Sequence, residues 1–155
     1  MQILFVCTGN TCRSPMAEAI CKRMLDSERI PDVEVHSAGL FVPVPSDMSK
    51  HAISALDALG IHEFTHTATQ LTKDAVAHAD LILAMTPEHA AQLRQACPDC
   101  AGKINTLFGF AYGKDKPVDD PFGQPYEVYE ACAQEIRDAL VQVFQRLKEQ
   151  QWKLT

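Results

Sequence analysis

The sequence lacks any apolar run close to the roughly 20 residues that a membrane-spanning helix requires, and it lacks an excess of positive charge. Its 155 residues include 14 Lys and Arg against 20 Asp and Glu, which gives a formal net charge of −6 at pH 7. A chain of this charge is poorly suited to bind phosphate backbones, so we expect neither nucleic acid nor a membrane as a partner. The N-terminus also lacks the basic lead of a signal peptide, and we expect a cytoplasmic protein.

Internal repeats, low-complexity tracts and linker-like segments are absent from the sequence as well. Of its residues, 46% are hydrophobic and 22% are charged, which is ordinary for a soluble globular protein. The length suits one core, and we expect a single domain over residues 1–155. The chain is too long for a typical disulfide-stapled domain, so its six cysteines are expected to be reduced thiols. They are Cys7, Cys12, Cys21, Cys97, Cys100 and Cys132.

Short apolar runs alternate along the chain with segments of helical periodicity. Ser14 is expected to cap the first helix, Trp152 to anchor the last one, and residues 109–126 to form a long loop. Strands that alternate with helices indicate a parallel sheet covered on both faces, here a three-layer α/β/α sandwich with a central four-stranded sheet. The predicted strands are 2–6, 33–37, 81–85 and 103–107, and the predicted helices are 15–27, 46–59, 72–79, 86–96 and 126–150.

The stretch CTGNTCRS, residues 7–14, directly follows the first predicted strand, where α/β proteins bind ligands. A tight loop before a helix N-terminus directs backbone N–H groups at an anion, and Gly9 permits the conformations that such a loop needs. Arg13 adds a charged planar fork that can hold two oxygens of a tetrahedral oxyanion. A thiol that faces this positive pocket ionises readily, so Cys7 is a candidate nucleophile. Three polar residues are candidates for bracing the loop or the thiolate: Asn10, Ser14 and Ser37.

Attack of a thiolate on phosphorus also needs a proton donor for the leaving group. The predicted long loop carries DDPFG, residues 119–123, in which Pro121 stiffens the chain behind Asp120. Taken alone, CTGNTCRS could be a turn whose cysteine merely packs, and DDPFG could be a solvated acidic turn. The two motifs in one chain favour phosphoryl transfer.

Together, FVCTGNTCRSPMAEAI (5–20) and DDPFG resemble the low-molecular-weight protein tyrosine phosphatase family. The similarity continues through HSAG (36–39) and LTKDAVAHADLILAMT (71–86) into the last predicted helix, and so covers nearly the whole chain. The resemblance implies a protein phosphatase that forms and hydrolyses a phosphocysteine. It implies phosphorylated protein side chains as substrates, inorganic phosphate as product, and neither a cofactor nor a metal ion.

Residue by residue, the resemblance implies that Cys7 is the nucleophile and Arg13 the phosphate clamp. Asp120 would act first as acid and then as base for the water that hydrolyses the phosphocysteine. Cys12 matches a thiol that can pair with Cys7 under oxidation and protect it. The residues that match loop-bracing positions are Asn10, Ser14, Ser37 and His66. The expected phosphate- and substrate-binding residues are Thr8, Gly9, Asn10, Thr11, Cys12, Ser14 and Phe122.

The substrate is suggested by two departures from the pattern of most tyrosine-specific members. These carry a bulky aliphatic residue at position 11 and two aromatic residues after the Asp-Pro, whereas this chain has Thr11 and Phe122-Gly123. A threonine hydroxyl can accept a hydrogen bond from a guanidinium N–H, and Asp120 could accept from the same group. The pattern resembles the protein-arginine phosphatase branch, which hydrolyses the P–N bond of phosphoarginine. We therefore favour phosphoarginine, with phosphotyrosine as the alternative.

Two further motifs point to other functions. HEFTH (62–66) matches the zinc protease pattern, but it follows Gly60 and precedes alternating threonines, which favours an irregular segment over the helix that a zinc site needs. CPDC (97–100) could be half of a zinc site or a redox pair, although a turn at a helix end is favoured. It is similar to a feature of arsenate reductases of the same fold, which makes arsenate reduction a less favoured alternative. The remaining histidines are expected on the surface or in packing: His36, His51, His78 and His89.

Overall fold

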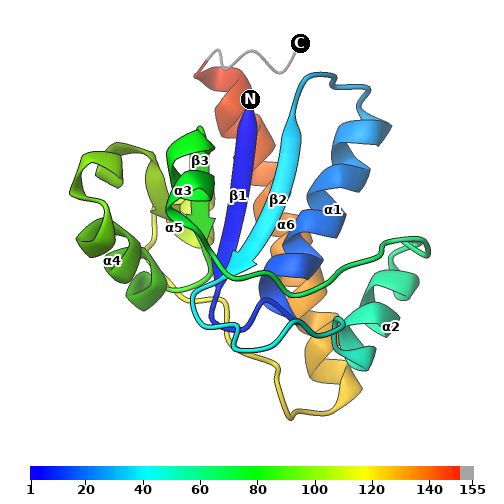
Figure 1. Cartoon of the computed structure of the whole chain (residues 1–155). Coiled ribbons are helices and arrows are strands. Elements are labelled where there is room, and N and C mark those ends of the chain that lie inside the picture. Colours follow the sequence, from blue (N-terminus) through cyan, green and yellow to red (C-terminus); the bar gives the residue numbers. More distant parts are fainter. Residues whose placement is uncertain (151–155) are drawn as a thin grey trace.

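The computed structural model describes residues 1–150, which form one twisted sheet flanked by helices (Figure 1). The four strands lie in the order β2-β1-β3-β4, and all three neighbouring pairs are parallel. This confirms the predicted four-stranded parallel sheet. The strands are β1 (Gln2–Cys7), β2 (Glu34–Gly39), β3 (Leu81–Ala84) and β4 (Ile104–Thr106).

Helices cover both faces of the sheet, as predicted (Figure 1). The central strand β1 alternates between two cores: Ile3 and Phe5 pack with α1, α2, α5 and α6, whereas Leu4 and Val6 pack with α3 and α4. The helices are α1 (Arg13–Ser27), α2 (Lys50–Ala58), α3 (Lys73–His78), α4 (Pro87–Ala96), α5 (Leu107–Tyr112) and α6 (Tyr126–Glu149), with a 3₁₀ turn η1 (Pro98–Lys103).

Threonine or serine side chains cap four of these helices by accepting a backbone N–H. The caps are Ser49, Thr72, Thr86 and Thr106. Helix α1 has no such cap, and the prediction that Ser14 caps it was wrong. The helix already begins at Arg13, so Ser14 lies inside its first turn and its hydroxyl turns toward the loop before the helix.

Two further expectations were wrong. Part of the predicted loop 109–126 is helical, because α5 begins right after β4 and ends at Tyr112, followed by Gly113, whose φ of 73° is in the left-handed region. Not all cysteines are free thiols, because Cys97 and Cys100 are joined in a disulfide at the end of α4.

Trp152, which was expected to anchor the last helix, lies outside the described residues. No helix within residues 1–150 is long and apolar enough to cross a membrane.

Candidate active site

The loop between β1 and α1 lies at the carboxyl edge of the sheet, and we call residues 7–13 the phosphate loop. Cys7 ends β1 with 3% of its surface exposed, and Arg13 starts α1 with 6% exposed. The Asn10 backbone N–H donates to Cys7 Sγ over 3.3 Å, and the Ser14 hydroxyl lies 2.9 Å from the same sulfur. Two polar groups therefore converge on the thiol, and either can donate to a thiolate.

Asn10 ties the phosphate loop to its surroundings. It is fully buried and has a φ of 57°, in the left-handed region that asparagine tolerates better than most residues. Its side-chain N–H₂ donates to the hydroxyls of Ser14 (2.7 Å) and Ser37 (3.0 Å). Its side-chain oxygen accepts from the Thr69 backbone N–H over 2.9 Å, and its carbonyl lies 2.8 Å from His66 Nε2. The four residues expected to brace the loop thus lie together.

A buried carboxylate that the sequence analysis missed extends this network. The Ser37 hydroxyl donates to Glu18 Oε1 over 2.6 Å, and Lys22 Nζ donates to Glu18 Oε2 over 2.6 Å. Glu18 is only 8% exposed. Ser14, Glu18 and Lys22 recur at every fourth position of α1, a spacing that places polar side chains on one helix face and could have revealed the network.

The expected acid lies on a segment that we call the acid loop, residues 118–123. Val118 anchors this loop, because its N–H donates to Met85 O at the end of β3 and its carbonyl accepts from Arg13 Nη1 over 3.0 Å. Asp120 Oδ2 lies 3.4 Å from Arg13 Nη2, and the other carboxylate oxygen accepts from the Phe122 N–H over 3.1 Å. The Asp120 side chain is 54% exposed and Phe122 is 71% exposed, so both are open to solvent beside the phosphate loop and its buried Cys7 thiol.

The remaining residues of the phosphate loop contact the elements packed around it. Thr11 is half-buried, and its carbonyl accepts from the Ser49 N–H at the start of α2. Cys12 is buried, is a free thiol like Cys7, and its Sγ lies 3.8 Å from the Tyr129 hydroxyl. A close approach of β2 requires glycine at position 39, because a Cβ there would lie 2.6 Å from the Thr8 carbonyl oxygen.

One histidine assigned to the surface or to packing contacts the phosphate loop directly. His89, in the first turn of α4, is 6% exposed, and its Nε2 lies 2.8 Å from the exposed Thr8 hydroxyl. Burial and the nearby positive charge of Arg13 lower the pKa of His89. The stretch Thr86-Pro-Glu-His89 is typical of a helix start, so nothing in the sequence indicated that His89 contacts Thr8.

The alternative motifs do not assemble into sites. The HEFTH segment is not helical, and its histidines diverge: His62 pairs with Asp57, whereas His66 contacts the phosphate loop. Residues 1–150 contain no group of three or more His, Cys, Asp or Glu arranged to hold a metal ion. The Cys97–Cys100 pair follows the C-terminus of α4, whose N-terminus is the end near the phosphate loop, so it is remote from Cys7.

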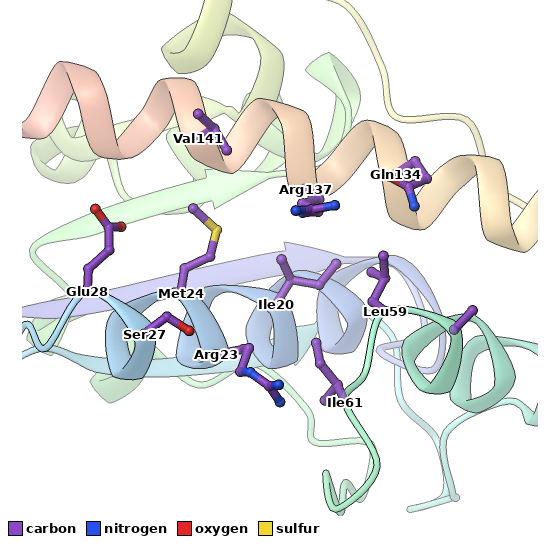
Figure 2. Close-up of a pocket in the computed structure, with 11 residues that line it drawn as sticks. Ile20, Arg23, Met24, Ser27, Glu28, Leu59, Ile61, Gln134, Arg137 and Val141 are labelled. Carbon is purple, nitrogen blue, oxygen red and sulfur yellow. The ribbon is translucent and has the colours of Figure 1, made fainter.

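A separate hollow of about 490 Å³ lies between α1 and α6 (Figure 2). In that view, side chains of α1 face those of α6, and Leu59 and Ile61, which follow α2, lie beside them. None of the expected site residues lines it. The lining residues are Ile20, Arg23, Met24, Ser27, Glu28, Ala58, Leu59, Ile61, Gln134, Arg137 and Val141.

Comparison with known proteins gives one consistent family. Residues 2–153 match the sequence model described as low molecular weight phosphotyrosine protein phosphatase. The chain is 41% identical over 150 residues to a protein-arginine-phosphatase of Geobacillus stearothermophilus, covering 97% of this chain and 98% of that protein. It is 35% identical over 130 residues to the low molecular weight protein-tyrosine-phosphatase Etp of Escherichia coli, covering 83% and 82%. A solved mutant of the YwlE arginine phosphatase with a phosphorylated active-site serine matches over all of both chains, with a TM-score of 0.92 and 36% identity.

Proposed function

The chain belongs to the low molecular weight phosphotyrosine protein phosphatase family, and on that premise we propose that it hydrolyses phosphoarginine in proteins through a phosphocysteine. The observation that carries this proposal is the buried Cys7 thiol, with two polar groups aimed at its sulfur and the guanidinium of Arg13 at the other end of the same loop. Such a loop holds a tetrahedral anion against a nucleophile.

In the first step, the Cys7 thiolate attacks phosphorus while loop N–H groups and Arg13 hold the phosphoryl oxygens. The P–N bond breaks, and Asp120 gives its proton to the departing guanidine nitrogen. The Ser14 hydroxyl, 2.9 Å from the sulfur, donates to the thiolate and thereby favours the ionised thiol. This step leaves a phosphocysteine on the enzyme, an unmodified arginine side chain on the substrate, and Asp120 as an ionised carboxylate.

In the second step, a water molecule attacks the phosphocysteine and Asp120 takes its proton. The S–P bond breaks, the thiolate is restored and inorganic phosphate leaves. Because the Asp120 side chain is 54% exposed, water can reach it between the two steps. The position of Asp120 beside Arg13 supports a role at the same phosphoryl group in both steps.

The preference for arginine rests on Thr11 and Asp120, which together offer oxygen acceptors to a guanidinium. It is supported by the name of the Geobacillus relative, a protein-arginine-phosphatase 41% identical to this chain. Phosphotyrosine remains the second candidate because Phe122, 71% exposed beside Asp120, offers a face on which a phenyl ring can stack.

One assay separates the two substrates. Two peptides of the same sequence, one with phosphoarginine and one with phosphotyrosine at the same position, are hydrolysed side by side and kcat/KM is measured for each. We expect the larger kcat/KM for phosphoarginine. A larger value for phosphotyrosine would contradict the arginine assignment and leave the phosphatase assignment intact.

A further inference from the structure

His89 has an unusual hydrogen-bonding pattern for a histidine so close to a reactive loop. Its Nε2 lies 2.8 Å from Thr8 Oγ1, and its backbone N–H is held by Thr86 Oγ1 over 3.1 Å at the start of α4. The other ring nitrogen, Nδ1, is buried without a hydrogen-bond partner among the described residues. Such an atom in a buried side chain requires an explanation.

The unpartnered Nδ1 favours one tautomer of the neutral ring. Burial and Arg13 lower the pKa of His89, against the opposing charges of Glu88 and Asp120, which favours the neutral ring with one N–H at neutral pH. An orphaned buried N–H is rarer in proteins than an under-satisfied acceptor. On these grounds we expect the proton on Nε2, donating to the Thr8 hydroxyl oxygen, and Nδ1 without a proton.

This tautomer determines what the Thr8 hydroxyl can do. Because Thr8 Oγ1 accepts from His89, its own proton must point away from His89. Thr8 follows the nucleophile Cys7 directly and its side chain is exposed, so this proton is available to a bound group. A guanidinium has only donors, whereas phosphoryl oxygens accept hydrogen bonds.

We propose that His89 is a positioning residue. By donating to Thr8 Oγ1, it orients the Thr8 hydroxyl so that the hydroxyl proton is donated to a phosphoryl oxygen. The pair adds one side-chain donor to the backbone N–H groups of the phosphate loop. The proposal rests on the phosphate-binding part of the proposed function and is independent of the choice between phosphoarginine and phosphotyrosine.

The tautomer can be measured directly. Long-range ¹H–¹⁵N correlation spectra of the full chain distinguish a proton on Nε2 from one on Nδ1 of His89. We expect the Nε2–H form in the free protein and with inorganic phosphate bound. The Nδ1–H form would overturn the proposal, because Thr8 would then have to donate to the ring.

Binding of inorganic phosphate, followed by NMR titration, tests the consequence without any turnover. Thr8→Val removes the donor and should weaken phosphate binding about 10-fold or more, as for a hydrogen bond to a charged group. His89→Leu leaves the hydroxyl but frees it among three staggered positions, and should weaken binding about threefold. His89→Gln can still donate an amide N–H and should stay within about twofold of the parent protein.

The double variant Thr8→Val/His89→Leu decides whether His89 acts through Thr8. It should bind phosphate as Thr8→Val does, because no hydroxyl is left to orient. A further loss in the double variant, or equal losses for His89→Leu and His89→Gln, would mean that His89 only supports packing and would overturn the proposal. Parent-like binding by Thr8→Val would overturn it too. Failure to hydrolyse either phosphopeptide would contradict the proposed function while leaving this binding series interpretable.

Discussion

The phosphate loop and the acid loop contact each other, but they differ in how much of each loop is buried and hydrogen-bonded. In the phosphate loop, Asn10 is fully buried, and its amide oxygen, amide nitrogen and carbonyl oxygen are all within hydrogen-bonding distance of partners. In the acid loop, Val118 is buried and hydrogen-bonded through its backbone to Met85 and Arg13, but the side chain of Asp120, two residues later, is 54% exposed. The difference fits the two tasks that we propose for these loops: donors that hold an oxyanion act best when fixed in advance, whereas an acid that also serves as base must meet water.

The two loops should also differ in what they contribute to stability and to turnover. Replacing a buried, hydrogen-bonded group in the phosphate loop should affect folding as well as activity. Replacing the exposed Asp120 should affect activity alone, since exposed ion pairs such as its 3.4 Å contact with Arg13 stabilise little.

The largest effect is expected for Cys7→Ser. A serine hydroxyl stays protonated at neutral pH, so turnover should fall to an undetectable level, while Arg13 and the loop N–H groups still bind inorganic phosphate. Steady-state assays and phosphate titration measure the two properties separately. Cys97→Ser/Cys100→Ser is the matched control, because that pair is remote from the site and should keep full activity. Substantial turnover by Cys7→Ser would remove Cys7 from the role of nucleophile.

The next effect in size is expected for Asp120→Ala, which should lower kcat by about 10²–10⁴, the usual range for a general acid–base. The loss should shrink for an aryl phosphate whose leaving group needs no proton. The free energy of unfolding should stay within about 0.5 kcal/mol of the parent value, as for an exposed surface position. Asp119→Ala is the control, and greater damage there would show that the wrong member of the Asp-Asp pair was chosen.

A smaller, substrate-dependent effect is expected for Thr11→Ile, at a half-buried position of the phosphate loop. The variant loses an acceptor for the guanidinium, a charge-assisted bond of about 1.5–3 kcal/mol, so kcat/KM for phosphoarginine should fall about 10- to 150-fold. Phosphotyrosine hydrolysis should be spared or raised, because a phenyl ring loses no contact. Thr11→Ser keeps the hydroxyl and serves as control. Equal losses on both substrates would restrict Thr11 to supporting the loop.

The fold could be predicted from the sequence because its signals are local. Apolar runs indicated the strands, and periodic segments with Ser or Thr at their starts indicated the helices. Where Gly109, Gly113 and the nearby prolines suggested a loop, the short helix α5 forms because Thr106 caps it and its apolar side chains reach α6. A capping rule placed Ser14 just before the helix, although the helix begins two residues earlier than predicted, because sequence alone did not show that the Ser14 hydroxyl is used by Cys7 and Asn10.

The candidate site was predictable to the extent that its residues stand in recognisable motifs. Cys7, Arg13 and Asp120 stood in two such motifs, and the structure brings all three together. Contacts between segments distant in the chain carried no such signal. His89 meets Thr8 only because β1 and β3 are neighbours in the sheet, and Glu18 meets Ser37 only because α1 packs against β2.

The smallest effects are expected at Glu18, where two substitutions test whether the buried network itself stabilises the phosphate loop. Glu18→Gln keeps an oxygen that can accept from the Ser37 hydroxyl and loses mainly the contact with Lys22, whose side chain is 47% exposed. It should lower the free energy of unfolding by no more than about 1 kcal/mol. Glu18→Ala leaves the buried Ser37 hydroxyl without its acceptor and should cost about 1–3 kcal/mol. Because Ser37 in turn accepts from Asn10, the alanine variant should also lower kcat/KM several-fold more than the glutamine variant. Urea unfolding and side-by-side kinetics of the two variants measure this. Equal stability and activity for the alanine and glutamine variants would mean that the phosphate loop holds its shape without the buried carboxylate.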